Sequence, residues 1–122
     1  MFNFINVEKA YQKLKTRVRC TPLFNVYPLG SGIDYNLYLK LDLNQVTGTF
    51  KYRGVMNKIL SCPPPLLEKG LVAASGGNHG RAVAYAGYQL NLFTKVYLPQ
   101  TTPAYKIEMI TKWGAEVDLT GS

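Results

Sequence analysis

Two periodicities alternate in the second half of the chain, residues 61–122. Short apolar runs at residues 71–74, 95–98 and 116–119 have the length of buried strands. Between them, apolar side chains recur every three or four positions, which is typical of helices that bury one face. The resulting β-α-β-α-β order predicts an α/β fold with parallel strands, right-handed crossovers and helices on both faces of the sheet.

The second of these helices has recognisable ends. Thr102 is expected to be its cap, with Pro103 at the first helical position, where proline is favoured. Gly114 is expected to end the helix, because glycine readily adopts the left-handed conformation that follows helices. The expected inner stripe of the helix comprises Ile107, Ile110 and Trp113.

The first half of the chain is less regular. The spacing of apolar residues predicts a helix over residues 7–15, with Asn6 as its cap. Strict alternation of leucines with polar residues over 37–43 predicts a strand with one buried face. Another helix is expected to begin at Thr49. Its core-facing residues are Tyr52, Val55, Met56, Ile59 and Leu60.

Prolines and glycines mark the connections. Residues 21–23 are expected to be extended, because a residue before proline avoids the helical region. Residues 30–32 read as a flexible connection and residues 44–48 as a turn. The three prolines at residues 63–65 lack amide donors, so neither a helix nor a central strand is expected there. This stretch divides the chain into two parts of similar length.

Composition narrows the class of protein. Of the 122 residues, 47% are hydrophobic and 17% are charged, which is typical of globular proteins. No run approaches the roughly 18 apolar residues of a membrane-spanning helix, and the first residues do not resemble a signal peptide. The net charge of +7 is uneven, because residues 1–61 carry nine basic and three acidic side chains. These cations are spaced out, so we expect no nucleic-acid partner, although a basic nucleic-acid binder stays an alternative.

The cysteines and the histidine give no sign of a metal site. Cys20 and Cys62 lie far apart, and His79 is the only histidine, so the four usual zinc ligands are missing. We expect both cysteines to be reduced thiols and the protein to be cytoplasmic.

A glycine-rich turn, SGGNHG at residues 75–80, follows the first strand of the expected parallel sheet. Ligands of such sheets bind at the carboxyl ends of the strands, and the amides at the start of a helix attract anions. The spacing fits neither the dinucleotide fingerprint nor the P-loop. Taken alone, such a turn is more often a tight connection, and its His79 is more often a structural side chain than a ligand or base.

Lys51 stands in the first turn of its expected helix, where a cation opposes the helix dipole. That position is unfavourable for a purely structural residue. Burial and positive potential would favour the neutral amine that imine chemistry requires. Taken alone, a single lysine is nevertheless more often a solvated surface residue.

Five motifs in order make a more specific pattern. They read TPL at residues 21–23, LKLD at 39–42, TGTFKYRG at 47–54, SGGNHG at 75–80, and a stretch from VYLP to GAEVDLTG at 96–121. In this order they resemble the pyridoxal 5'-phosphate (PLP) enzymes of the tryptophan synthase β fold, known as fold type II. Within these, the chain is most similar to the threonine/serine dehydratases and the serine racemases.

The resemblance implies a role for several residues. Lys51 would be the catalytic Schiff-base lysine, Phe50 would lie beside the cofactor ring, and Asn78 would bond the phenolic oxygen of the cofactor. The substrate carboxylate would be received by backbone amides of a turn made of Ser75, Gly76, Gly77, Asn78 and His79. The implied reaction is dehydrative deamination of L-threonine or L-serine to a 2-oxo acid and ammonia.

The chain also departs from the family pattern. Thr49 replaces the usual serine, and Arg81 stands where glutamine is common, with no role that we can assign. Gly76 occupies the place of the catalytic serine of racemases, which argues against racemisation. The family runs well over twice as long. Its glycine-rich phosphate loop, the residue that meets the pyridine nitrogen and its divalent-cation site would lie beyond Ser122.

The resemblance therefore implies a truncated version of the three-layer parallel-sheet fold. Residues 1–60 would form the N-terminal part of the large domain, with the Schiff-base lysine, and residues 61–122 most of the small domain. The expected partners are a small amino-acid substrate and either a second copy of the chain or a separate C-terminal half. The alternatives are a catalytically inactive fragment, one half of a split enzyme and, with less support, a serine racemase.

Overall fold

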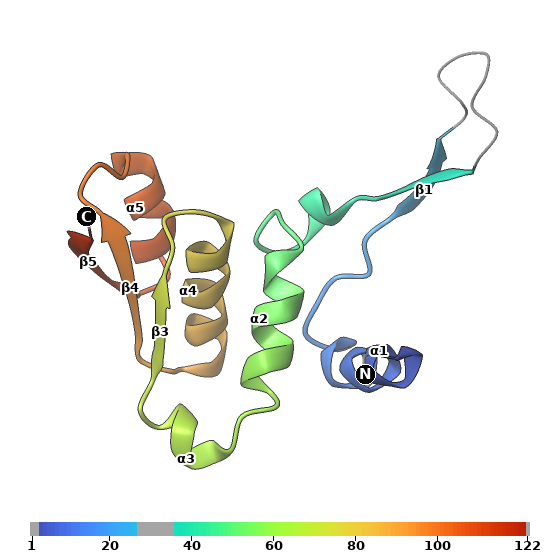
Figure 1. The fold of residues 1–122 in the computed structure, drawn as a ribbon, viewed down its shortest axis with the longest axis horizontal. Helices are drawn as coiled ribbons and strands as arrows, with labels where there is room; N and C mark the ends of the chain where they lie inside the picture. Colours follow the sequence, from blue (N-terminus) through green and yellow to red (C-terminus); the bar gives the residue numbers. More distant parts are fainter. Residues whose placement is uncertain (1–2, 27–35, 122) are drawn as a thin grey trace.

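The computed structural model describes residues 3–26 and 36–121. The connection expected at residues 30–32 lies outside these residues. Within them, a three-stranded sheet is made of β3 (Leu71–Ala74), β4 (Thr94–Pro99) and β5 (Glu116–Gly121), in the order β3-β4-β5 with both pairings parallel. The crossovers are α4 (Asn78–Leu90) and α5 (Ala104–Thr111) (Figure 1). The predicted β-α-β-α-β unit is confirmed.

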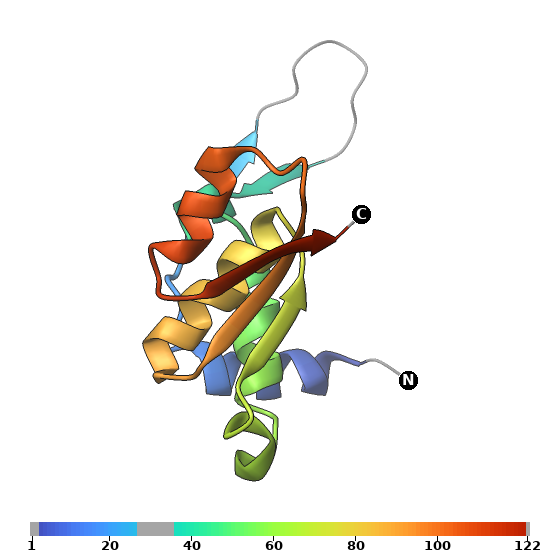
Figure 2. The ribbon, with the colours of Figure 1, turned by 90° about the vertical axis from the view of Figure 1, so that its left-hand side faces the viewer.

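Both crossover helices lie on the same face of this sheet (Figure 2). Ala73, Val96 and Leu98 are buried beneath them, whereas Val72 on the opposite face is 69% exposed. The expectation of helices on both faces was wrong for the described residues. The strand order explains why: each crossover moves one position in the same direction, and two right-handed crossovers in one direction place both helices on one side.

The helix α2 (Lys51–Ile59) packs against α4 and joins the two halves of the chain. Tyr52 and Met56 of α2 are almost completely buried, and Ala82 and Ala86 of α4 have no exposed surface. The four core-facing positions predicted within α2 are all buried, and Leu60, which follows the helix, is partly buried. Small side chains on α4 allow the two helices to approach closely, which fixes where α2 begins relative to the sheet.

The first helix, α1 (Phe4–Leu14), begins three residues earlier than predicted. Its cap is Asn3, whose side chain accepts a hydrogen bond from the backbone amide of Asn6, so the assignment of Asn6 as the cap was wrong. Only Leu14 of this helix is buried. The remaining apolar side chains of α1 are therefore largely on the surface.

A two-stranded antiparallel sheet projects from the rest of the molecule (Figure 1). It pairs β1 (Leu23–Val26) with β2 (Leu37–Lys40), and every residue of β2 is exposed. The predicted strand over 37–43 with one buried face is thus only partly correct. The strand is shorter because Asp42 begins a single 3-10 turn, η1 (Asp42–Asn44), and no described element covers either face of the hairpin.

Three further boundaries differ from the sequence-based expectations. A short helix, α3 (Pro64–Leu67), follows α2, because prolines are tolerated in the first turn, where their missing amides have no intrahelical role. The exclusion of a helix there was wrong. In α5 the capping position is taken by Pro103 and no side chain caps the helix, so the role predicted for Thr102 was also wrong. The helix α5 ends at Thr111, before the predicted end, and Gly114, with φ of +77°, lies in the turn that follows it.

A hydrogen-bond network ties the start of α2 to the segment before β1. The Arg53 guanidinium donates to both carboxylate oxygens of Asp42, with Nε–Oδ2 and Nη2–Oδ1 distances of 2.9 Å. Thr21 Oγ1 donates to Asp42 Oδ1, and Arg53 also donates to the carbonyl of Arg19. Bidentate pairs between arginine and a carboxylate are among the stronger hydrogen bonds in proteins. This pair fixes the position of η1 relative to the start of α2.

The same pair should make stability depend on pH. The hydrogen bonds from Arg53 hold the pKa of Asp42 below its ordinary value of 3.8. A carboxyl with a lowered folded-state pKa stabilises the fold above its unfolded pKa, and this contribution is lost as the pH falls through the folded value.

We expect Asp42→Asn to lower the free energy of unfolding by about 1–3 kcal/mol at pH 6, because Arg53 then lacks its carboxylate. The loss relative to wild type should shrink below pH 4. Urea unfolding at pH 6 and pH 3 measures both effects. Glu68→Gln, at an exposed residue without an ion pair among the described residues, is the control. An Asp42→Asn loss that is equal at the two pH values would contradict the assignment.

Candidate functional site

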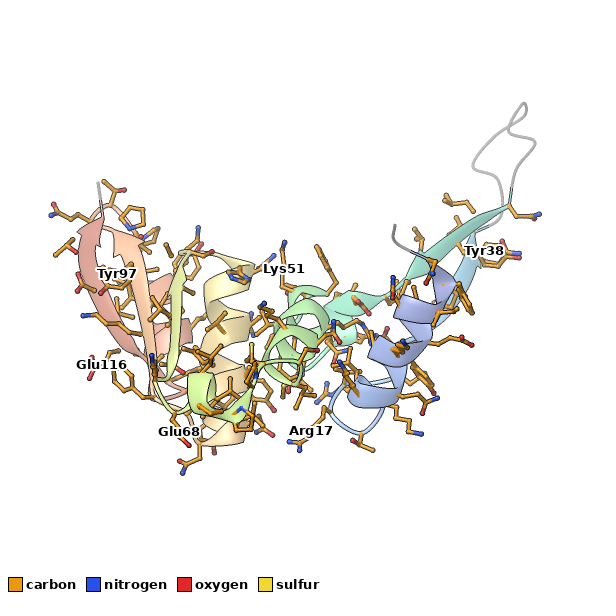
Figure 3. The ribbon with its side chains drawn as sticks, turned by 60° about the horizontal axis from the view of Figure 1, so that its bottom comes forward. Arg17, Tyr38, Lys51, Glu68, Tyr97 and Glu116 are labelled. Carbon is orange, nitrogen blue, oxygen red and sulfur yellow. The ribbon has the colours of Figure 1, made fainter. Side chains whose placement is uncertain are left out.

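Lys51 is the first residue of α2, at the end that lies beside the turn after β3 (Figure 3). Its amine lies 5.1 Å from the centroid of the Phe50 ring. Both side chains are exposed, so the described residues do not supply the burial that would favour a neutral amine. The buried residues of the next turns, such as Tyr52 and Val55, anchor the helix and so fix the backbone from which Lys51 projects.

The turn at residues 75–80 connects β3 to α4 as predicted. Its Ser75 Oγ accepts a hydrogen bond from the amide of Gly77 at 3.3 Å. Gly77 is the capping residue of α4, and no side chain caps the first amides of that helix. Because these amides have no intrahelical acceptor, they are free to bind an anion, which is the chemistry expected of this turn.

Close packing explains one glycine of the turn. A Cβ atom on Gly80 would lie 2.0 Å from the carbonyl oxygen of Ser75, closer than any real contact. The residue is buried and must remain glycine if the turn is to fold back onto the start of α4. By contrast, a Cβ atom on Gly77 would meet nothing within 4 Å.

The predicted site residues divide between two neighbouring cavities. Lys51, Phe50 and His79 line a cavity of about 530 Å³ between α2, α3, β3 and α4. Gly76, Gly77 and Asn78 line a second cavity of about 190 Å³ between the starts of α4 and α5. Ser75 lines neither cavity. The structure therefore brings the lysine and the histidine end of the turn together, and it does not place Asn78 in the same cavity as Lys51.

The larger cavity has walls suited to an aromatic ring. Its lining is mainly apolar and includes Val55, Val83 and Leu71. Its polar lining residues are Lys51 and His79, together with Lys58 and Cys62. An exposed amine at one end of an apolar cavity can bind a ligand that carries an aldehyde. The uncapped helix amides beside it can bind a carboxylate. The described residues thus fit part of a PLP site. No cluster of three His, Cys, Asp or Glu that could hold a metal ion occurs among them.

Electrostatics favours anions at this end of the molecule. None of α2, α4 and α5 has an acidic residue in its first turn. Instead, the first turns carry Lys51, Arg81 and Lys106. Arg81 and Lys106, which have no role assigned from the sequence, both line the smaller cavity. Their only sequence signal is a cation near the start of a helix, where it opposes the helix dipole.

Comparison with known proteins identifies the class. The family model described as "Pyridoxal-phosphate dependent enzyme" matches residues 14–122. The chain belongs to this family of PLP-dependent enzymes, and the predicted resemblance to fold type II is confirmed.

Among curated proteins, the chain is similar to the L-threonine ammonia-lyase of Geobacter sulfurreducens, with 36% identity over 121 residues. The match covers 99% of this chain and 30% of the relative. Among solved structures, the T.th. threonine deaminase has a TM-score of 0.82 and 33% identity, and the match covers 99% of this chain and 38% of that one. The serine racemase of Dictyostelium discoideum has a TM-score of 0.87 and 31% identity, with 96% and 38% covered.

Two limits follow from these matches. The chain spans about a third of the length of the curated relatives that it matches. Deaminases and racemases share the fold equally well, so similarity of fold does not separate the two reactions.

None of the described helices has the length and apolar character needed to cross a membrane.

The role of Gly80 can be tested by a matched pair of helix substitutions. We expect Gly80→Ala to lower the free energy of unfolding by about 1–3 kcal/mol, because the new methyl group collides with the Ser75 carbonyl and forces the turn to move. Gly54→Ala in α2, where a Cβ atom meets nothing within 4 Å, should instead stabilise the chain by about 0.5–1 kcal/mol.

Thermal and urea unfolding of the two variants measure the difference, and amide chemical shifts of residues 75–80 report whether the turn moves. Equal effects of the two substitutions would show that the turn tolerates a side chain at position 80.

Proposed function

We propose that this chain carries the lysine-bearing part of a PLP-dependent enzyme that dehydrates and deaminates L-threonine or L-serine to a 2-oxo acid and ammonia. The observation that carries the proposal is the cavity shared by Lys51 and His79, which joins an exposed amine to a turn whose backbone amides are uncapped. The similarity to a threonine ammonia-lyase over nearly the whole chain supports it.

Each proposed residue has a physical task. Lys51 supplies the amine that holds the cofactor and later takes the proton from the substrate Cα. Phe50 lies beside that amine and offers an aromatic surface to the cofactor ring. The turn from Ser75 to His79 would bind the substrate carboxylate through its amides, and Asn78 would bond the phenolic oxygen of the cofactor. When bound, PLP supplies the electron sink that makes the Cα proton removable.

Elimination rather than racemisation is proposed because of Gly76. A racemase needs a second acid–base group on the opposite side of the substrate, and a positioned group of this kind accelerates proton transfer by about 10²–10⁴. Gly76 has no side chain to supply it. A Cβ atom at this position would lie 3.4 Å from Thr102 Oγ1, so the space beside Gly76 borders a threonine side chain.

Two other proposals concern organisation and location. We propose that residues 1–60 and 61–122 are parts of a large and a small domain, and that the chain works as a homo-oligomer or together with a separate C-terminal half. The exposed hairpin of β1 and β2 supports association, because an isolated two-stranded sheet is marginally stable in water. A cytoplasmic location is proposed from the two free cysteines, Cys20 and Cys62.

The second candidate function is a non-catalytic chain, either an inactive fragment or one half of a split enzyme. It is favoured by one observation: Lys51 and Asn78, both proposed to contact the cofactor, line different cavities in the described residues. The two candidates differ in what the chain does by itself.

Lys51 is expected to be the residue that binds PLP. Incubation of the chain with PLP, reduction with borohydride and peptide mapping should place the adduct on Lys51, because its amine opens into the apolar cavity. Lys51→Ala should abolish this adduct. Lys112→Ala, at an exposed lysine outside both cavities, is the matched control and should leave the adduct unchanged. An adduct mapped mainly to Lys40, Lys58 or Lys106 would refute the assignment.

The 122 residues alone are expected to form no measurable 2-oxobutyrate from L-threonine, even with saturating PLP. The amine by itself gives a hydrolysable link, and Asn78, the other residue proposed to contact the cofactor, lines a different cavity from Lys51. A coupled assay for 2-oxobutyrate, with Lys51→Ala as the blank, measures this. Steady product formation that disappears in Lys51→Ala would show that this part of the site is sufficient.

A further inference from the structure

The smaller cavity, between the starts of α4 and α5, is lined by two cations. Arg81 comes from the first turn of α4, and Lys106 comes from the first turn of α5. The other lining residues include Gly76, Gly77 and Tyr105, and no acidic residue is among them. Two like charges that face one small cavity repel each other unless an anion lies between them.

The two cations also lack compensation elsewhere. The ion pairs among the described residues are Arg53–Asp42 and Lys95–Asp118, so neither Arg81 nor Lys106 has a carboxylate partner there. Arg81 is partly buried, and its Nε is fully buried with no hydrogen-bond acceptor among the described residues. A partly buried guanidinium without a counter-charge is unfavourable, and an anion in the cavity would offset that cost.

Polar groups on the other side of Arg81 are also unpaired. A Cβ atom on Gly48 would lie 3.8 Å from Arg81 Nη1, which places the guanidinium beside the turn before α2. The hydroxyls of Thr47 and Thr49, on either side of Gly48, are buried and have no partner in the described part of the chain. Thr47 is only 2% exposed. Arg81 therefore extends from the wall of the smaller cavity to the turn at residues 47–49. The two hydroxyls of that turn carry no charge that could balance the positive charge of Arg81.

We propose that this cavity is an oxyanion site in which Arg81 and Lys106 bind a carboxylate or phosphate group. The arginine offers a planar fork of N–H donors that matches either oxyanion, and the amides at the start of α4 add donors at the turn. The site is separate from the cavity that contains Lys51. Its ligand is a small molecule that carries a phosphate or carboxylate group and is not the amino-acid substrate, so the proposal does not rest on the proposed function.

The test uses the 122-residue chain without PLP. Inorganic phosphate is titrated at constant ionic strength, with chloride as the counter-titration, and the Arg81 Nε–Hε resonance is followed by NMR. We expect a saturable shift with phosphate and none with chloride. L-Serine is titrated in the same way, and a saturable shift that phosphate displaces would overturn the proposal, because the cavity would then belong to the substrate-binding turn.

Variants show which side chains bind. Arg81→Gln, which keeps a planar hydrogen-bonding group, and Lys106→Gln should each weaken phosphate binding by about tenfold, as measured by calorimetry. Lys112→Gln, at a residue outside the cavity in the same segment, should not. Circular dichroism establishes that each variant is folded. Since Lys106 is only partly buried, its variant tests the site even if Arg81→Gln unfolds.

The outcome is independent of the proposed catalytic role. Lys51→Ala should leave phosphate binding intact while abolishing the PLP adduct, so failure of one proposal is distinguishable from failure of the other. Equal shifts with phosphate and chloride, or binding that Arg81→Gln and Lys106→Gln both leave unchanged, would overturn the oxyanion site.

Discussion

The packing of α2 against α4 is the constraint on which the candidate site depends. Tyr52 and Met56 are buried against a stripe of small residues on α4, where Ala82 and Ala86 leave no exposed surface. Lys51 and the turn before α4 lie on separate segments of the chain, and only this contact brings them to one cavity. A larger residue at either alanine would push the two helices apart. The Lys51 amine would then move away from the backbone amides of the turn before α4.

At the end of the molecule that carries Lys51, exposed side chains project from a well-packed support. Below it, Arg53 connects α2 to Asp42 of η1 and to Arg19 and Thr21 before β1. The buried residues of α2 fix the rotation of the helix about its axis. At the end itself, Lys51, Asn78 and His79 are exposed. The packing of α2 and α4 fixes the backbone positions of these three residues. The described residues do little to restrict the conformations of their side chains.

The sequence predicted the parallel β-α-β-α-β unit because its signals are local. Short apolar runs, helical spacing and Gly114 each act within a few residues, and the motifs around Lys51 and the turn at 75–80 identified the family. The failures were non-local. The alternation over 37–43 indicates a half-buried strand, but burial depends on a neighbour that the described residues do not include. The division of the turn between two cavities, and the location of Arg81 in one of them, depend on how α4 and α5 pack.

The strand order β3-β4-β5 also bears on how the chain folds. Each strand pairs with the next one along the sequence, and each crossover helix covers the strands that it joins. The paired residues are 23 positions apart between β3 and β4 (Leu71 and Thr94) and 21 apart between β4 and β5 (Lys95 and Glu116). The core that joins Leu14 and α2 to α4 spans far more of the chain, so its loop-closure entropy is larger. We therefore expect the sheet with its two helices to form before the core that includes Leu14.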